Sequence, residues 1–367
     1  MTSADDIARR KSEHMQLAAE RDDVQTTAGA GWEDIQLVHD ALPAIDASEV
    51  DLSARFLGRK LRLPLVIAGM TGGHPQALAL NGLLARAAER EGIAIGVGSQ
   101  RAALRDPSLE PTYAVVREAA PRAFVIANVG ISQLVGQTKG DALSAKELRR
   151  VVDMVRANAL ALHLNYLEES VQPEGQTRAR GSSAAIRRLV RRSRVPIIAK
   201  ETGSGISRDV ARRLRLLGVK AIDVGGVGGT SFAAIESVRA EARGDALRSG
   251  LGHRFRDWGM PTAVSVIGAS AAKIPIIATG GVRSGLDAAK AIALGATLVG
   301  VGRPLLQAAL RGEHAVDSWI RAFELELRTA VFLTGQRRSA DLPRAPLVVT
   351  GPTRAWVDQL GYRFRPR

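Results

Sequence analysis

The sequence predicts an α/β fold, a (β/α)8 TIM barrel with an N-terminal helical extension and an insert between strands 6 and 7. Three observations lead to this fold class. Eight short apolar runs recur along the 367 residues, helical patterns separate most of them, and glycine and polar residues cluster after each run. Alternating strands and helices form right-handed βαβ units, and eight such units close into a barrel. A doubly wound parallel sheet is the alternative if some runs are helical.

The predicted strands are continuous apolar runs, as expected for parallel strands that are buried on both faces. They lie at 64–68, 93–97, 123–127, 160–164, 195–199, 220–224, 274–278 and 297–301. Apolar residues spaced i, i+3, i+4 predict helices between them, for example at 81–91, 145–158 and 286–294.

Two segments fall outside this regular pattern. About 60 residues precede the first run, and they contain a predicted helix at 5–20 followed by a polar connection. The longest gap separates the sixth and seventh runs. It holds GLGHRFRDWGMPTAVS (250–265), which we interpret as an inserted loop or lid. We therefore divide the chain into an extension, residues 1–60, and a barrel, residues 61–367.

The composition excludes several classes of protein. Hydrophobic residues make up 46% and charged residues 24%, which supports a large core and argues against wholesale disorder. The absence of cysteine excludes disulfides, thiolate metal sites and a cysteine nucleophile. The net charge is +14, but with 4% aromatic residues and no recognised binding motif we expect no nucleic-acid partner. The polar N-terminus and the lack of any apolar run of about 18 residues predict a cytoplasmic protein without a membrane span.

The polar and glycine clusters point to one functional face. They are GMTGG (69–73), GSQR (98–101), NVG (128–130), HLNYLEE (163–169), KETGSG (200–205), GGVGGTS (225–231), TGGVRSG (279–285) and GRP (302–304). In a barrel the loops after the strands converge on the C-terminal face, where enzymes of this fold keep their sites. We therefore expect the site at this face.

The last two clusters are typical of a phosphate site. Glycine permits positive φ and close backbone approach, and backbone N–H groups at a helix start bind phosphate. Barrels often bind phosphate after strands 7 and 8, so Arg283 or Arg303 is expected near the anion. Each cluster taken alone is also compatible with a plain tight turn. Lys200 ends a strand, where it either directs charge at the electron-rich end of a cofactor or is simply a paired lysine.

The densest polar group follows the fourth strand. His163 and Asn165 are two residues apart, so on a strand both side chains point to one face, at the mouth of the barrel. Glu169 is a candidate Mg²⁺ ligand, because Mg²⁺ usually takes one or two carboxylates together with substrate phosphates. The alternative is a solvated acidic turn.

The predicted N-terminal helix carries a second polar group. Arg10 and His14 are four residues apart and share a helix face, with Lys11 beside them. We consider two interpretations, an anion clamp on a mobile segment and an ordinary solvated helix.

These motifs together resemble the type 2 isopentenyl-diphosphate Δ-isomerase family, whose members are FMN-dependent barrel enzymes. The resemblance covers nearly the whole chain. The matching stretches are RKSEH (10–14), GMTGG (69–73), GVGSQRAAL (96–104), NVGISQ (128–133), HLN (163–165) with QPEG (172–175), KETGSGIS (200–207), GGVGGTS (225–231), WGMPTA (258–263), ATGGVRSGLDAAKAIALGA (278–296), FLTG (332–335) and VVTGPTRAW (348–356). The most specific of these matches are in RKSEH, SQRAAL and HLN with QPEG, because glycine-rich loops alone would indicate only a flavin-binding barrel.

The resemblance implies an activity and its cofactors. The reaction is the interconversion of isopentenyl diphosphate and dimethylallyl diphosphate by proton transfer involving reduced FMN, with no net redox change. It also implies Mg²⁺, NAD(P)H as the reductant, a prenyl diphosphate substrate and a homo-oligomer of four or more subunits. The extension would then hold a substrate-clamping helix, and residues 61–367 would form the FMN-binding barrel.

The resemblance also assigns residues by position. It implies a catalytic group of Glu168, His163 and Asn165, and Glu169 as the metal ligand. The implied substrate-binding residues are Arg10, Lys11, His14, Ser99, Gln100, Arg101 and Phe232. The implied flavin-binding residues are Met70, Thr71, Ser99, Asn128, Lys200, Thr230, Gly281, Arg283, Gly302 and Arg303.

Two positions depart from the family pattern. Glu168 stands where the family usually has Gln, and Phe232 stands where it usually has Trp. A carboxyl can donate a proton more readily than an amide, and Phe leaves more room than Trp. The alternative hypothesis is therefore a related flavoenzyme that protonates a longer prenyl chain in order to isomerise or cyclise it.

Two further classes are weaker alternatives. A hydroxyacid oxidase needs a basic histidine near the later loops, and His253, inside the insert, is the sole histidine there. Nucleotide dehydrogenases of this barrel class use a cysteine, which the chain lacks. A non-enzymatic nucleic-acid-binding protein has only the basic charge in its favour.

Overall fold

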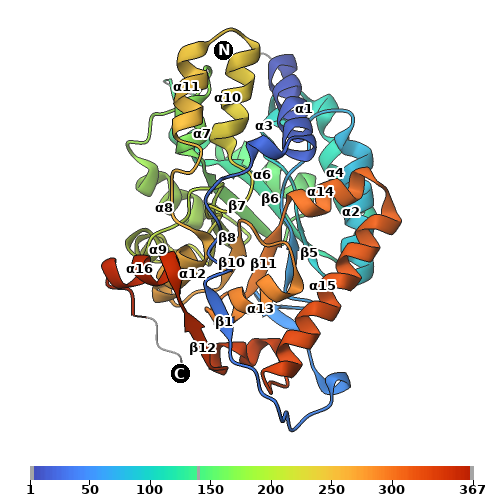
Figure 1. The fold of residues 1–367 in the computed structure, drawn as a ribbon. Helices are drawn as coiled ribbons and strands as arrows, with labels where there is room; N and C mark the ends of the chain where they lie inside the picture. The colour runs from blue at the N-terminus through green and yellow to red at the C-terminus, as the bar shows by residue number, and fades with distance from the viewer. Residues whose placement is uncertain (1–3, 139–140, 364–367) are drawn as a thin grey trace.

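The computed structural model describes residues 4–138 and 141–363, and it confirms the predicted barrel (Figure 1). Each of the eight predicted runs overlaps a strand, and all neighbouring strands in the closed ring are parallel, in the order β10-β11-β4-β5-β6-β7-β8-β9. The strands are β4 (Leu65–Ile67), β5 (Ala94–Gly96), β6 (Phe124–Gly130), β7 (Ala159–Leu164), β8 (Ile197–Glu201), β9 (Ala221–Asp223), β10 (Ile276–Thr279) and β11 (Leu298–Val301).

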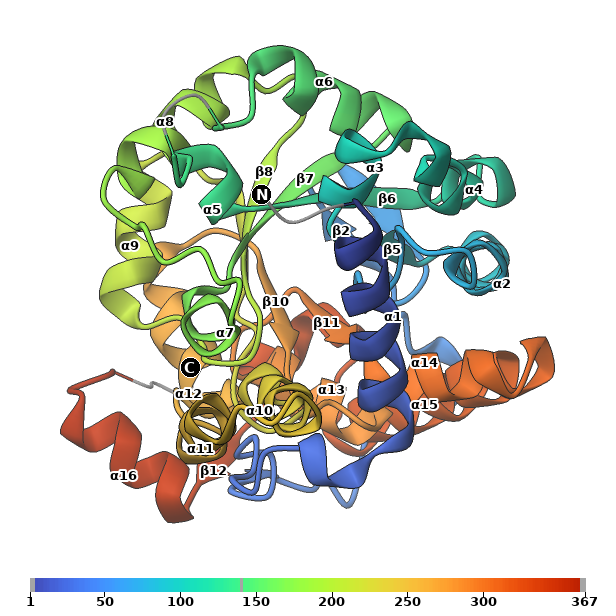
Figure 2. The ribbon, with the colours of Figure 1, turned by 90° about the horizontal axis from the view of Figure 1, so that it is seen from above.

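Helices cover the outside of the barrel (Figure 2). The helices of the outer layer include α2 (Ala77–Glu91), α4 (Pro111–Ala119), α6 (Ala145–Met154), α8 (Ser182–Arg192), α9 (Arg208–Leu216), α13 (Gly285–Ala293), α14 (Arg303–Leu310) and α15 (Glu313–Leu333). The helix predicted at 145–158 ends at Met154 instead. The chain turns at Arg156, whose φ is +41°, in order to enter β7, and a helix cannot continue through that conformation.

The interior of the barrel changes from apolar to polar along the strands. Side chains two residues apart on a strand share a face, so inward-facing positions form layers. The lower layers are apolar and include Val66, Phe124, Ile126, Ile198, Ile277 and Leu298. One step further toward the strand C-termini, register pairs His163 with Lys200 and Lys200 with Asp223. The apolar layers are therefore the floor beneath a polar mouth.

The insert between strands 6 and 7 is largely helical, which corrects the predicted loop at 250–265 in part, because residues 255–261 between two of its helices are not helical. It consists of α10 (Phe232–Ala242), α11 (Ala246–Arg254) and α12 (Thr262–Ala269), and α10 and α11 stand side by side above the barrel mouth (Figures 1 and 2). A Cβ on Gly252 would lie 2.5 Å from the carbonyl oxygen of Ala233 on α10. This glycine therefore permits close helix packing rather than loop flexibility.

The N-terminal extension contains the predicted helix as α1 (Ala4–Glu20), which lies across the mouth (Figure 2). The connection after it is less polar than expected, because Trp32 and Ile35 are buried. Strand β1 (Ile35–Leu37) pairs antiparallel with β12 (Leu347–Val349), and helix α16 (Gly351–Gln359) follows. The hairpin β2 (Ala54–Phe56) and β3 (Arg59–Leu61) adds Phe56 to the apolar layers at the bottom of the barrel. None of the described helices is both long and apolar enough to cross a bilayer.

Candidate functional site

A cavity of about 470 Å³ lies at the C-terminal ends of the strands. Every one of the eight glycine and polar clusters contributes to its lining, together with α1 and the start of α10. The structure thus brings together nearly all the residues singled out from the sequence. Those that line the cavity are Arg10, Lys11, His14, Met70, Ser99, Arg101, Asn128, His163, Asn165, Glu168, Glu169, Lys200, Thr230, Phe232, Gly281, Arg283, Gly302 and Arg303.

Thr71 and Gln100 are not among the residues that line this cavity, so their expected ligand roles stay predictions. Gln100 is fully buried; its Nε2 donates to the Val151 carbonyl at 2.8 Å, and its Oε1 accepts from the Asn128 backbone N–H at 3.0 Å. Thr71 is buried and hydrogen bonds to Asn81. Both side chains turn inward because they satisfy buried polar groups of the loops behind the cavity.

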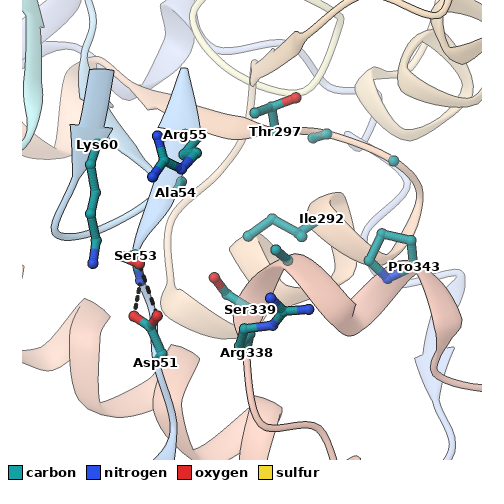
Figure 3. Close-up of a pocket in the computed structure, with 13 residues that line it drawn as sticks. Asp51, Ser53, Ala54, Arg55, Lys60, Ile292, Thr297, Arg338, Ser339 and Pro343 are labelled. Carbon is teal, nitrogen blue, oxygen red and sulfur yellow. Dashed lines mark hydrogen bonds between the residues drawn. The ribbon is translucent and has the colours of Figure 1, made fainter. Parts of the chain in front are cut away.

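A second cavity of about 520 Å³ lies at the opposite end of the barrel (Figure 3). Its lining includes Ala54 from the bottom hairpin and Thr297, which precedes strand β11. The charged residues that line it are all exposed: Asp51, Arg55, Lys60 and Arg338. Because TIM-barrel sites lie at the C-terminal face, we assign the chemistry to the first cavity.

Two hydrogen-bonded pairs form the polar floor of the site. Nδ1 of His163 lies 2.7 Å from Oδ1 of Asn128. Asn128 Nδ2 donates to the Val97 carbonyl, so Oδ1 is the acceptor and the His163 Nδ1 carries the proton. Burial, with the nearby charges of Lys11, Lys200 and Arg101, lowers the pKa of His163 to about 3. His163 is therefore neutral at physiological pH.

The second floor pair is an ion pair between Lys200 Nζ and Asp223 Oδ2 at 2.9 Å. The other oxygen of Asp223, Oδ1, is buried and has no hydrogen-bond partner among the described residues. The same holds for Oγ1 of Thr279 on the neighbouring strand. Buried polar atoms are normally paired, so these two oxygens indicate that the floor of the cavity suits a polar ligand group.

The loops after β9, β10 and β11 form a glycine-lined cradle. A Cβ on Gly229 would lie 3.0 Å from the backbone nitrogen of Gly281, whose φ is +65°. These glycines leave backbone N–H groups accessible to an anion. Arg283 borders the cradle and donates to the Gly228 carbonyl at 3.1 Å. Arg303 instead donates to the Ala18 carbonyl at 2.7 Å, so it also ties the end of α1 to the barrel.

Lys11 connects α1 to the loops of the site through hydrogen bonds. Its buried ammonium donates to the Gly72 carbonyl at 2.9 Å, to the hydroxyl of Tyr113 at 2.8 Å and to the Ser99 carbonyl. Burial first, and then the charges of Arg10 and Arg101, lower the pKa of Lys11 to about 7. The side chain therefore docks the helix on the loops after the first two strands.

Three cations crowd one side of the cavity. Arg10 contacts Gln172 at 3.2 Å, and Arg101 contacts Gln176 at 3.2 Å. Burial, together with the nearby charge of Arg10, lowers the pKa of Arg101 as well. Arg10 also lies 3.6 Å from the carboxylate of Glu174, which balances part of this charge, and an anion placed among the three cations would offset the remaining repulsion.

The two adjacent glutamates after β7 differ in their surroundings. Glu169 accepts from Gln172 Nε2 at 2.6 Å and from the Gln176 N–H at 2.7 Å through Oε2, while its Oε1 has only contacts of 3.3 Å. Glu168 accepts from Asn165 Nδ2 at 3.0 Å. Burial, followed by the charge of the carboxylates nearby, raises the pKa of Glu168, so it favours the protonated form.

Two functional residues escaped the sequence analysis. Glu236 on α10 is fully buried, and it bonds His14 Nε2 at 2.7 Å and Arg239 at 2.6 Å. Single ligand atoms of His14, Glu168 and Glu236 lie within 4.8 Å of one another. Glu201 is the second. Its Oε2 accepts from the backbone N–H groups of the three residues that follow it, which fixes the loop after β8. The sequence offered one signal for each residue. Glu236 is a carboxylate in an otherwise apolar stretch, and Glu201 directly precedes the TGSG motif.

Comparisons with known proteins agree with this geometry. A model of the FMN-dependent dehydrogenase family matches residues 136–349. An isopentenyl-diphosphate delta-isomerase of Methanoregula boonei is 47% identical over 352 residues, covering 95% of this chain and 96% of the relative. The isopentenyl-diphosphate delta-isomerase of Methanothrix thermoacetophila is 48% identical over 356 residues, and the alignment covers 97% of each chain.

Solved structures support the fold. A putative lactate oxidase of Pediococcus acidilactici matches with a TM-score of 0.65 and 18% identity, covering 96% of this chain and 95% of that one. A mandelate oxidase bound to (S)-mandelic acid matches with a TM-score of 0.60 and 19% identity, covering 96% and 99%. At these identities the likeness concerns the barrel alone.

Proposed function

The chain belongs to the type 2 isopentenyl-diphosphate delta-isomerase family and is an FMN-dependent isomerase, and from this premise we propose that it interconverts isopentenyl diphosphate and dimethylallyl diphosphate. The observation that carries the proposal is the convergence of Arg10, Lys11 and Arg101 on one side of a cavity with a buried polar floor. That arrangement suits a diphosphate at one end and an uncharged hydrocarbon between the polar groups.

Substrate binding begins at the cations. Arg10 and Arg101 would bind the diphosphate oxygens, and Lys11, whose three N–H groups already bind protein acceptors, would add its positive charge beside them. Burial and the neighbouring positive charges disfavour the charged forms of Lys11 and Arg101, and a bound anion would offset both effects. Glu169 would hold Mg²⁺ against the same diphosphate. Its Oε1 has only long contacts, and Asn165 Oδ1 is buried without a partner, so the oxygen ligands that Mg²⁺ prefers are present.

The cavity also fits FMN. The glycine cradle with Arg283 would receive the flavin phosphate, and the unpaired oxygens of Asp223 and Thr279 would meet polar atoms of the ring. Reduced FMN, when bound, supplies a group that can give and take a proton beside the alkene. Lys200 would stabilise the negative charge of the reduced ring system, and its pairing with Asp223 holds the ammonium in place.

The remaining residues would orient the alkene. His163 is held neutral and fixed by Asn128, so it would present a polar edge without adding charge. Asn165 fixes the carboxyl of Glu168 at 3.0 Å. Glu168, whose pKa is raised by burial at the cavity wall, would assist the transfer of a proton to the double bond.

The second candidate function keeps this scaffold and changes the substrate. Phe232 begins α10 and meets the ring of His14 edge-on, with ring centroids 5.8 Å apart. A smaller aromatic side chain at this position enlarges the cavity beside Glu168. The enzyme would then protonate a longer prenyl chain and start its isomerisation or cyclisation.

A product assay tests both candidates. The purified FMN-loaded enzyme is given Mg²⁺, NAD(P)H as the proposed reductant, and prenyl diphosphates of C5 to C20. Formation of dimethylallyl diphosphate from isopentenyl diphosphate at an ordinary rate supports the first function. If only longer substrates are converted, the second function holds, and the Glu168→Gln, Phe232→Trp double variant should restore C5 turnover.

The subunit number, proposed as four or more, is measured by light scattering.

A further inference from the structure

The positive charge of the protein is concentrated in one segment. Residues 176–222 contain 13 lysines and arginines but only two acidic residues, so this segment carries +11 of the net +14. One of the two acids, Glu201, is held inside by three backbone N–H groups. Eleven of the cations are exposed, and we call them the basic face: Arg178, Arg180, Arg187, Arg188, Arg191, Arg192, Arg194, Arg212, Arg213, Arg215 and Lys220.

The basic face is continuous on the outer wall of the barrel. Helices α8 and α9 are neighbours there (Figure 2). A Cβ on Gly218, just after α9, would lie 2.8 Å from Cγ1 of Val190 on α8, so the C-terminal ends of the two helices touch. Arg191 and Arg192 therefore lie beside the end of α9, which carries Arg215. None of the residues of the basic face lines the cavity at the mouth of the barrel.

The side chains of the basic face have no counter-ion among the described residues, whereas many arginines elsewhere in the protein are paired. Arg90, for example, pairs with Glu313 and Asp317, and Arg239 pairs with Glu236. Among the described residues, no carboxylate forms an ion pair with any side chain of the basic face. Like charges held together at this density repel one another, so an extended anionic surface would stabilise them.

The shape and chemistry of the face select among anionic partners. A second copy of the same face would bring like charges together. Residues 176–222 contain no aromatic side chain on which the bases of single-stranded nucleic acid could stack. Leu216, at the exposed end of α9, has 83% of its surface accessible, which adds an apolar contact suited to a lipid interface.

We propose that the basic face of α8 and α9 docks the protein reversibly on an anionic phospholipid bilayer. Clusters of four to eight basic residues on a surface are sufficient for binding to acidic lipids. Each such charge strengthens the attraction by about fivefold at low salt. Docking in this way needs no membrane-spanning segment, and it leaves the substrate cavity accessible from solution.

Vesicle flotation with the FMN-loaded full-length protein tests the proposal. We expect the protein to float with vesicles of phosphatidylcholine and phosphatidylglycerol, to stay behind with pure phosphatidylcholine, and to be released by 0.5 M NaCl, roughly the ionic strength that screens such contacts. Replacing Arg187, Arg188, Arg191 and Arg192 by Gln should weaken binding by at least about tenfold. Leu216→Asn should weaken it by a few fold.

The control is a second quadruple variant, which removes four positive charges from outside the basic face. Gln at Arg149, Arg254, Arg311 and Arg321, all exposed, should leave vesicle binding within about twofold of the wild type. Equal loss in both quadruple variants would overturn the proposal, because net charge alone would then explain binding. Absence of binding to acidic vesicles would overturn it too, as would tighter binding to a duplex RNA probe than to vesicles. Bound flavin and the melting temperature report whether each variant is folded.

Discussion

His14 on α1 lies with its Nε2 2.7 Å from Oε1 of Glu236 on α10, so a fully buried carboxylate joins the two helices that cover the mouth of the barrel. Arg239, one turn further along α10, bonds the other oxygen of Glu236 and also reaches Glu13 on α1. The two helices are therefore fastened by alternating charges. Breaking this contact should affect both stability and the closure of the site.

Glu236→Gln should lower the free energy of unfolding by about 3 kcal/mol at pH 7, because it leaves Arg239 buried with less compensation. Contacts with His14 and Arg239 lower the pKa of Glu236 despite its burial. Its stabilising effect is thus present above the unfolded pKa and is lost as the pH falls through the folded pKa. Denaturation curves should show the difference shrinking below pH 4.5. The exposed Glu241→Gln is the control, and an equal loss there would refute the buried pair.

Binding of inorganic pyrophosphate should take up a proton through Lys11. Its pKa is about 7 in the free protein, so at pH 8 most of the amines are neutral, and a bound anion that raises this pKa draws in a proton. The uptake should vanish near pH 5, where Lys11 is already charged. Calorimetry in two buffers of different ionisation enthalpy measures it. Arg10→Gln should weaken binding and keep the uptake, whereas uptake by Lys11→Met would contradict the assignment.

Lys200→Met should lower the midpoint potential of bound FMN by on the order of 50 mV, because the ammonium would no longer stabilise the reduced ring. It should also cost about 3 kcal/mol of stability, since Asp223 would remain buried and unpaired. The Lys200→Met, Asp223→Asn double variant should regain most of the stability but not the potential. Dye-equilibrated spectral titration and denaturation measure the two effects. If the double variant recovered both the stability and the midpoint potential, Lys200 would act only as a structural partner of Asp223.

Glu168→Gln should become relatively more stable than the wild type as the pH rises. Burial raises the pKa of Glu168, so between its unfolded and folded pKa the native protein binds more protons than the unfolded chain. Stability of the wild type therefore declines with pH over that window, and a neutral Gln avoids the decline. Denaturation between pH 5 and 8 measures the gap, with the exposed Glu118→Gln as the reference. If the difference in unfolding free energy between the variant and the wild type did not change with pH, Glu168 would be ionised in the folded protein over this whole range.

Phe232→Trp should shift substrate preference toward shorter chains. The larger indole would fill space at the start of α10, where the cavity lies beside Glu168. We expect the ratio of kcat/KM for a C10 diphosphate over a C5 diphosphate to fall by about tenfold. Phe255→Trp adds the same bulk directly after α11, at a residue that is not among those lining the cavity, and it should leave the ratio unchanged. An unchanged ratio in Phe232→Trp would remove this residue from the chain-length determinants.

The strands could be predicted because burial on both faces requires a continuous apolar run, and nothing distant competes with that requirement. The helical structure of the insert could not be predicted in this way. Gly250 and Gly252 lie in a stretch that looks like a flexible loop, yet Gly252 is needed for close contact with α10. Local sequence cannot distinguish a glycine that frees the backbone from one that makes room for a neighbouring helix.

The candidate site divides in the same way. The loops after the strands were predictable, because parallel strands must end at one face. The partners of individual side chains were not. Glu236 lies 222 residues from His14 and 68 residues from Glu168, and no periodicity links them. Gln100 and Thr71 stand in site motifs, but their side chains turn to buried backbone and side-chain partners instead.

By itself, the sequence determined the eight-stranded barrel, the ring of glycine and polar loops at its mouth, and the family to which the chain belongs, because each rests on residues close together along the chain. Only the tertiary structure decided that the three donors of Lys11 bind protein acceptors, that Glu236 fastens α1, and that the excess arginines form one face. Those outcomes depend on which elements meet in space, and packing of the whole chain sets them.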